Sequence, residues 1–182
     1  MNLCTLAMTL SLIPYKTTLP KIAETVFIAP TAVVIGDVVV GDDSGIWYGS
    51  VVRGDVNEIR IGARTNIQDG TVIHVATHGQ GTYIGNDVTV GHMAVLHACT
   101  IEDWAFVGMK ACIMDGAIVE SWGMVAAGAL LTPGKRVSSG QLWAGSPAKF
   151  LRNLTDAEKD MFRWSAEHYV ELAQVHKQET KK

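Results

Sequence analysis

The stretch IGNDVTVGHMAVLHACTIEDWAFVGMKACIMDGAIV, residues 84–119, decides the fold because its aliphatic residues recur about every six positions. An α-helix would repeat its apolar residues at about 3.6 positions, and an amphipathic strand at 2. A period of six instead predicts short strands joined by turns that fall at the same place in every coil. The recurring residues then point inward and stack along one axis. They are Ile84, Val90, Leu96, Ile101, Val107, Ile113 and Val119.

The same period extends over residues 35–137, with insertions at 56–60 and 76–83. Gly and Asp residues between the aliphatic positions suit tight corners. We therefore predict an all-β fold, a left-handed parallel β-helix, whose coils pair as parallel strands about 4.8 Å apart. A β-sandwich is disfavoured, because it needs hairpin turns and alternation within each strand. The expected corners are Gly36-Asp37, Gly41-Asp42-Asp43 and Asp115-Gly116.

The repeat divides the chain into three parts: a loosely ordered extension (1–20), the β-helix (21–147) and a C-terminal segment with an α-helix (148–182). Thr155 and Glu158 form the pattern of a capping box at the start of this helix. An apolar stripe is predicted to pack the helix along the β-helix or on a neighbouring subunit. Its residues are Ala157, Met161, Trp164, His168 and Leu172, and we interpret His168 and His176 as helix-surface residues.

The composition excludes several classes of protein. Of 182 residues, 48% are hydrophobic and 18% charged, with a net charge of −3, so the chain can form a core but has no basic field for nucleic acid or an anionic membrane. The three cysteines do not describe a disulfide framework, and Cys99 and Cys112 read as small buried residues in a cytoplasmic protein. The apolar stretch 1–13 lacks a positive region before it and is too short to span a bilayer, and Met8 is a possible alternative start.

Several motifs resemble a known family. The chain contains Arg53-Gly54-Asp55, Asn66-Ile67-Gln68-Asp69, Ile73-His74, Gly91-His92 and Leu96-His97. Together with the hexapeptide repeats, they resemble the gamma-class carbonic anhydrases, and most of all their short bacterial, transferase-like relatives. The resemblance runs from about Pro30 to the end and includes 145–149.

The resemblance implies a homotrimer with metal sites at its subunit interfaces. His74 and His97 would bind zinc from one subunit, and His92 from its neighbour. The implied reaction is the reversible hydration of carbon dioxide to bicarbonate, and no organic cofactor is implied. Imidazole ligands also suit Fe²⁺ or Co²⁺.

The spacing agrees with the shared site. His74 follows Ile73 and His97 follows Leu96, so both occupy the same position on adjacent coils, about 4.8 Å apart. Two outward imidazoles at that distance can converge on one ion. His92 follows Val90 by two positions and should lie on another face, where only a second copy of the chain can bring it to the pair. By the same count, Arg53 falls in the column of His74, and Asp69 in the column of His92.

Five residues are candidates for catalytic roles. Gln68 can hydrogen-bond a metal-bound water or a bicarbonate oxygen, and Asp69 can hold Arg53. Arg53 and Asp55 form either part of the site or an ion pair that fixes the subunit interface. Tyr169 matches a tyrosine that closes the family's site.

The sequence departs from the family at two places. Val56 stands where a Glu follows the Arg-Gly-Asp motif, and the loop 75–79 has no carboxylate to carry protons, although His78 is a candidate carrier. We therefore predict weak or buffer-dependent hydration. Two other functions stay open: acyl transfer, which needs only one histidine as a general base, and a non-catalytic metal-binding or scaffold trimer.

Overall fold

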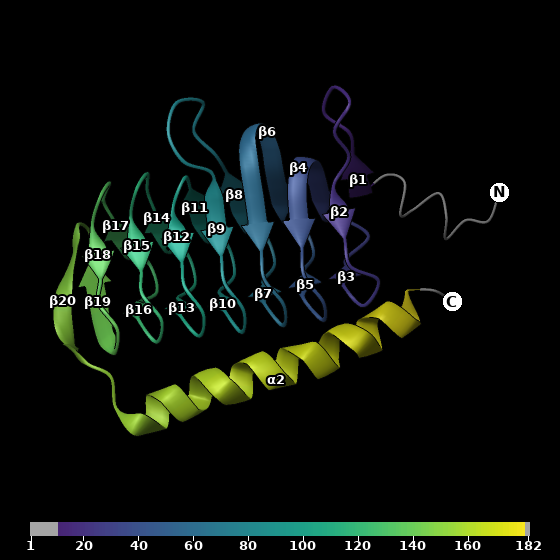
Figure 1. Cartoon of the computed structure of the whole chain (residues 1–182). Helices are drawn as coiled ribbons and strands as arrows, with labels where there is room; N and C mark the ends of the chain where they lie inside the picture. Colours follow the sequence, from purple (N-terminus) through teal and green to yellow (C-terminus); the bar gives the residue numbers. More distant parts are fainter. Residues whose placement is uncertain (1–10, 181–182) are drawn as a thin grey trace.

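The computed structural model describes residues 11–180, which form a left-handed parallel β-helix of about seven turns with one long C-terminal helix (Figure 1). The predicted fold class is confirmed. Among the described residues, no helix is long and apolar enough to cross a membrane. The predictions about the start of the chain, including Met8, concern residues outside the described range.

The strands form two sheets, and each coil contributes strands to both. The first sheet wraps over two faces and contains β1 (Leu12–Ile13), β2 (Lys21–Ile22), β4 (Val33–Val40), β6 (Val51–Ile61), β8 (Val72–His74), β9 (Thr82–Ile84), β11 (Val95–His97), β12 (Thr100–Ile101), β14 (Cys112–Ile113), β15 (Ile118–Val119), β17 (Leu130–Leu131) and β18 (Arg136–Val137). The second contains β3 (Phe27–Ile28), β5 (Gly45–Ile46), β7 (Asn66–Ile67), β10 (Thr89–Val90), β13 (Phe106–Val107), β16 (Met124–Val125), β19 (Gln141–Gly145) and β20 (Ala148–Asn153).

The core is the stack of aliphatic residues that the six-residue period predicts. Ile67, Val90 and Val107 occupy equivalent positions on β7, β10 and β13, and none is exposed. Each such residue contributes about 1.5–3 kcal/mol when fully buried. Parallel pairing in register therefore follows from the need to keep every aliphatic residue inside.

The expected corners are confirmed at all three places, but only two of them are turns between strands. Residues 41–43 and 115–116 form turns between strands. Gly36-Asp37 instead lies inside β4, where Gly36 has a φ of +76° and its Cα hydrogen faces the carbonyl of Gly54 in β6. The Gly residue there permits a bend and the close approach of two backbones, so β4 continues across the corner without a break.

The two insertions project from the solenoid as loops. The pairing of β4 with β6 shifts register between Gly36 and Val38, which pair with Gly54 and Ile59, so residues 55–58 bulge outward. The second insertion forms the loop 75–81 between β8 and β9. Both loops project on the side of the stack opposite to the C-terminal helix (Figure 1).

Both ends of the solenoid carry additional strand pairs. β1 pairs with β4, so the described part of the predicted 1–20 extension, residues 11–20, lies on the first coil. At the other end β20 runs antiparallel to β19, and the C-terminal segment thus begins with a strand before its helix.

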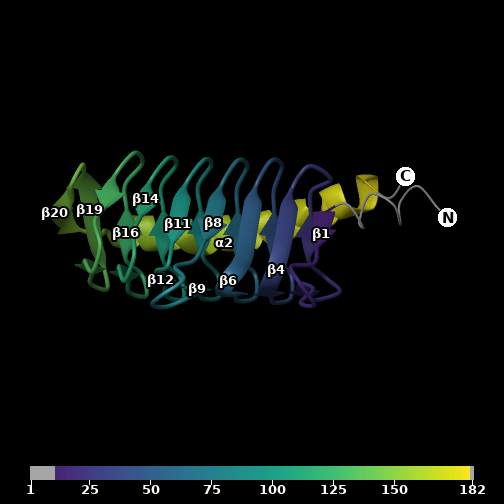
Figure 2. The same cartoon turned by 90° about the horizontal axis from the view of Figure 1, so that it is seen from above.

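Helix α2 (Asp156–Glu179) runs along the whole stack (Figures 1 and 2) and contacts β3, β5, β7 and β10 of the second sheet. The predicted capping box of Thr155 and Glu158 is confirmed. The predicted stripe does not pack on the β-helix at Met161 and Trp164, which are 37% and 60% exposed, although Leu172 packs against the core. Packing of the stripe on a neighbouring subunit stays a prediction. The buried residues of the helix are Phe162, Ser165, Ala166 and Ala173.

The prediction for His176 is also wrong. Its ring lies among Phe27, Trp47 and Tyr48, and its Nδ1 atom is 3.0 Å from the Tyr48 hydroxyl. His168 is half-buried and stacks on Trp164. The last turn of α2 is therefore fixed to the first coils by a polar contact that a helical pattern does not reveal.

Candidate metal centre

The rings of His74 and His97 face each other on adjacent coils. Their residues pair directly between β8 and β11, as the spacing predicts, and His74 Nδ1 lies 3.2 Å from His97 Nε2. Two nitrogen ligands 2.0–2.1 Å from a tetrahedral zinc ion are separated by about 3.3 Å. The pair thus has the nitrogen spacing of two ligands on one ion.

A carboxylate holds the far nitrogen of each ring. His74 Nε2 is 3.0 Å from Asp55 Oδ1, and His97 Nδ1 is 2.7 Å from Asp115 Oδ1. A carboxylate that accepts one N–H leaves the other ring nitrogen with a lone pair in the neutral imidazole. Both free nitrogens are the ones that face each other.

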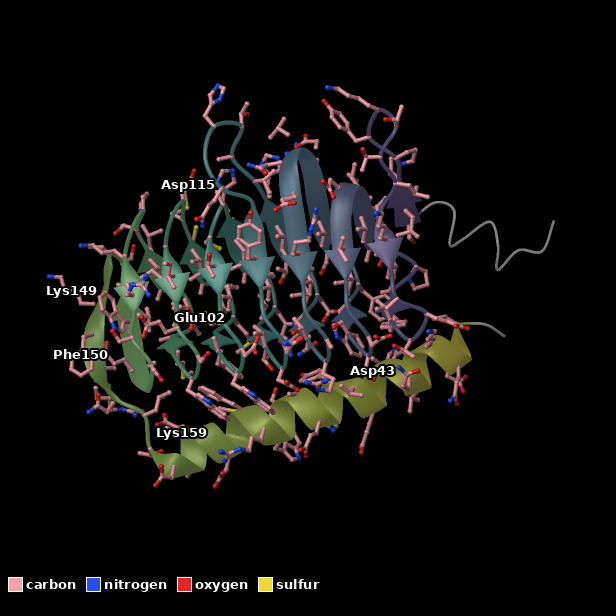
Figure 3. All side chains as sticks on the ribbon, viewed as in Figure 1. Asp43, Glu102, Asp115, Lys149, Phe150 and Lys159 are labelled. Atoms are coloured by element: carbon pink, nitrogen blue, oxygen red, sulfur yellow. The ribbon has the colours of Figure 1, made fainter. Side chains whose placement is uncertain are left out.

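The sequence analysis identified Asp115 only as a corner residue and not as a partner of His97. Its position carries a signal, because Ile113 pairs with Leu96 and Asp115 therefore follows one coil after His97, beside it at the same corner. Figure 3 shows Asp115 among the side chains at this corner.

Arg53 and Asp55 form an ion pair beside His74. Val52 pairs with Ile73, so Arg53 stands in the column of His74 as predicted. Burial on its own would raise the pKa of Asp55, but the hydrogen bonds from His74 and Arg53 outweigh it and hold this pKa below its ordinary value. Asp55 therefore remains a carboxylate that can accept the N–H of His74.

His92 lies on a different corner of the coil. Along this corner, Tyr48, Asp69, His92 and Met109 form a column with one residue on each coil. The backbone carbonyl of each accepts a hydrogen bond from the N–H of the residue that directly follows the next member of the column. Asp69 and His92 therefore share a column, as predicted. His92 Nδ1 is 2.9 Å from Asp69 Oδ2, and the His92 backbone N–H donates to Gln68 Oε1 at 3.1 Å. Gln68 is buried, and this hydrogen bond holds its side chain against the backbone of His92.

One chain thus brings together two of the three predicted ligands. No group of three or more His, Cys, Asp or Glu side chains within residues 11–180 is arranged to hold a metal ion in a single chain. All three histidines nevertheless share one feature. A carboxylate holds one ring nitrogen, and the other nitrogen is left with a lone pair that can bind a metal ion. This donor set fits zinc.

The remaining candidate residues differ in what they contact. Within one chain, Asp69 contacts His92, and Arg53 is ion-paired with Asp55 rather than with Asp69. Tyr169 lies on α2, where its ring meets that of Trp47 edge-on at 5.8 Å. His78 is exposed in the loop 75–81.

The two described cysteines differ in burial. Both are free thiols. Cys99 is buried as predicted, and burial raises its pKa to about 12. Cys112 is only partly buried, and its Sγ atom is 3.4 Å from the sulfur of Met114.

The chain is similar to known proteins both in its repeat and along most of its length. Residues 20–54 match the family described as bacterial transferase hexapeptide (six repeats). The chain is 54% identical to gamma carbonic anhydrase 2, mitochondrial, of Arabidopsis thaliana, over 90% of this chain and 60% of that protein, so it spans less than two thirds of this plant relative. It is 50% identical to the protein YrdA of Escherichia coli, over 86% of this chain and 89% of the relative.

Two further relatives are matched over nearly their whole length. The probable carbonic anhydrase of Methanocaldococcus jannaschii is 42% identical, over 85% of this chain and 96% of its own. The crystal structure of a hexapeptide transferase family protein from Anaplasma phagocytophilum is 50% identical with a TM-score of 0.89, and covers 92% of this chain and 99% of its own. The chain therefore belongs to the hexapeptide-repeat family, in its gamma carbonic anhydrase-like branch.

Proposed function

We propose that this protein is a zinc-dependent gamma carbonic anhydrase-like enzyme that hydrates carbon dioxide reversibly to bicarbonate in a homotrimer. The observation that carries the proposal is the pair of nitrogens, His74 Nδ1 and His97 Nε2, 3.2 Å apart and each on a ring anchored by a carboxylate. His92, anchored in the same way by Asp69, is the third ligand, supplied by the neighbouring subunit.

An exposed apolar surface supports the trimer. Val72 and Val95 pair in register and point outward on the face of β8 and β11, and Met93 and Met109 are exposed beside His92. This surface extends from the His92 corner toward the edge that carries His74 and His97. Contiguous exposed apolar patches mark interaction sites, and a threefold arrangement would bury this one while bringing each His92 to a neighbour's histidine pair.

The described side chains have definite tasks in this mechanism. His74, His97 and the partner's His92 would hold a zinc ion, which when bound would lower the pKa of water to about 7 and so supply hydroxide near neutral pH. Asp55, Asp69 and Asp115 fix the tautomers of the three rings. Gln68 accepts from the His92 backbone through Oε1, which leaves its Nε2 group to orient carbon dioxide or bicarbonate.

Proton export is expected to limit the rate. Val56 and the loop 75–81 carry no carboxylate near the pair, and His78 is the titratable side chain that the loop offers. We propose a reducing compartment such as the cytoplasm, because both described cysteines are free thiols.

Metal analysis of anaerobically purified protein, followed by hydration assays with zinc, iron(II) or cobalt(II), tests the proposal. We expect about one metal ion per chain and a hydration rate that rises when imidazole buffer is added. A high rate in dilute buffer that imidazole leaves unchanged would contradict the limited proton export. Metal binding without hydration would favour a scaffold, and a chain that binds no metal would exclude the proposed centre and reopen acyl transfer.

A further inference from the structure

Helix α2 has a second apolar face that stays exposed among residues 11–180. Met161 and Trp164 are exposed, and the ring of His168 stacks flat on Trp164 at 4.7 Å with an angle of 7° between the planes. This face is distinct from the one that packs on the sheet through Phe162 and Ala166. An exposed tryptophan in a stacked pair is the kind of rigid aromatic surface that is enriched in protein interfaces.

The side of this face that carries Met161 and His168 lies on the flank of α2 nearer the corner that carries His92. One flank of α2 is fixed by Gln174, whose Nε2 donates to the Thr25 carbonyl at 2.9 Å. The opposite flank is fixed by His176, which contacts Tyr48, the first member of the corner column that includes His92. On a helix that turns about 100° per residue, Met161 and His168 fall within about 80° of His176 and more than about 100° from Gln174. Trp164 lies about 120° from His176 and points away from the sheet, and it adjoins this flank through its stack on His168.

The stacked pair also lies at the level of the candidate metal centre. Thr89 Oγ1 is 2.9 Å from Ser165 Oγ in a buried contact, so α2 crosses β10 at the residue next to Trp164. His92 lies on the turn that directly follows β10. Trp164 and His168 therefore flank the coil from which His92 projects.

In the proposed trimer, this corner meets the partner's edge that carries His74. The loop 75–81 follows His74, and the bulge 55–58 lies beside it. Asn57 Nδ2 joins the two by donating to the carbonyls of Ala76 and Gly79 at 3.3 and 3.2 Å. In one chain these loops and α2 lie on opposite sides of the solenoid (Figure 1), so contact between them requires two chains.

The surface of these loops suits a neutral aromatic partner. Val56, Thr77 and His78 are exposed, and none of them is an acid or a permanently charged base. The two carboxylates of the bulge, Asp55 and Glu58, are ion-paired with Arg53 and Arg60. We propose that the Trp164–His168 pair of one subunit docks on the 75–81 loop and the 55–58 bulge of its partner, as an outer wall of the shared metal site. This inference rests on the proposed function for the existence and orientation of the trimer.

Photocrosslinking tests the contact directly. The photoreactive amino acid p-benzoylphenylalanine replaces Trp164 in one tagged copy, which is co-expressed with a differently tagged parent chain. The matched control places it at Phe150, an aromatic residue that is 50% exposed at the far end of the solenoid (Figure 3). Irradiation should give covalent dimers whose adducts map by mass spectrometry to residues 75–81 or 55–58 of the partner from position 164, and not from position 150.

Sedimentation of the same samples separates the two levels of the argument. A trimer whose adducts at 164 lie within its own chain, on another segment of the partner, or do not form at all would overturn the docking and leave the proposed function standing. A monomer would overturn both. As a second readout, Trp164→Ala should raise the trimer dissociation constant by on the order of tenfold or more, with Phe150→Ala close to the parent. Equal effects of the two substitutions would contradict the docking.

Discussion

At the scale of single residues, three carboxylates orient the histidines of the candidate metal centre. Asp55, Asp69 and Asp115 each lie within 3.0 Å of a nitrogen of a different histidine. Such partners set which nitrogen carries the proton and make the other a better donor. They would therefore orient the three rings for the proposed metal ion before it binds.

Replacing Asp115 should weaken the metal site without disturbing the fold. Asp115→Asn is expected to lower zinc affinity by about 10–100-fold, because the ring of His97 loses the carboxylate that orients it. Competition with a chromophoric chelator measures this. Asp103→Asn is the matched control, since Asp103 also occupies a corner but accepts from the backbone N–H of Asn86. Equal losses in both variants would show that the effect is not specific to the metal site.

The sequence predicts the histidine column but not the whole network behind it. His74 and His97 could be aligned by counting coils, because a repeat of fixed length places equivalent residues side by side. Asp115 lies one coil further along the same corner, but aspartate is common at corners for purely conformational reasons. Its residue type therefore does not distinguish it from the other corner carboxylates.

At the scale of elements, helix α2 shows why the hydrophobic pattern alone does not identify the side of the helix that packs on the solenoid. The side that packs on the sheet contains Ser165, Ala166 and Ala173, small residues that let the helix lie close to the strands. Met161 and Trp164 carry more apolar surface but lie on the outer side. A helix with two apolar faces gives a pattern that cannot say which one binds its own chain.

Phe162 should dominate the attachment of the helix to the solenoid. It is buried and stacks on Phe106 with ring centres 5.0 Å apart. Phe162→Ala should cost about 3–5 kcal/mol in the free energy of unfolding, because it leaves a cavity. Val175→Ala, at an exposed position of the same helix, should cost much less. Denaturant unfolding of both variants gives the comparison, and similar losses would mean that the two faces are equally packed.

The start of α2 should respond to acid through Glu158. Hydrogen bonds from Arg152 and from the backbone N–H of Thr155 lower the pKa of Glu158 from 4.5 to about 2. A carboxyl whose pKa is lowered by folding stabilises the folded state above its unfolded value, and this contribution is lost as the pH falls from 4.5 toward 2. Glu158→Gln should therefore flatten the loss of thermal stability in that range, and Glu167→Gln, at an exposed mid-helix position, should not. Parallel pH curves for parent and Glu158→Gln would contradict this.

At the scale of the whole molecule, the fold was the most predictable property and the assembly the least. The six-residue period specifies strand direction, register and core together, because each aliphatic residue must face inward on every coil. It also places His92 on a different corner from His74 and His97, which the register confirms. The division of the ligands between copies belongs to the proposed trimer.

Mixed trimers test the division of the ligands between subunits. His74→Ala and His92→Ala should each abolish tight zinc binding in a homotrimer, because every site loses one ligand. A trimer refolded from both variants has one boundary with all three histidines intact, and should bind about one zinc ion where the parent binds about three. Isolated mixed trimers that bind no zinc, while the parent does, would show that the three ligands are divided differently.

The path of α2 gives the solenoid a property that stacked repeats usually lack. A coil that contacts only its neighbours belongs to a one-dimensional array, whose ends can fray independently. Here α2 begins after β20 on the last coil and ends against the first coils, where Gln174 and His176 bind Thr25 and Tyr48. The two ends are thus coupled, and the array is closed into a loop. A chain that ends at Asn153 should lose protection from hydrogen exchange first in β1 to β3, whereas the intact chain should open as a single cooperative unit.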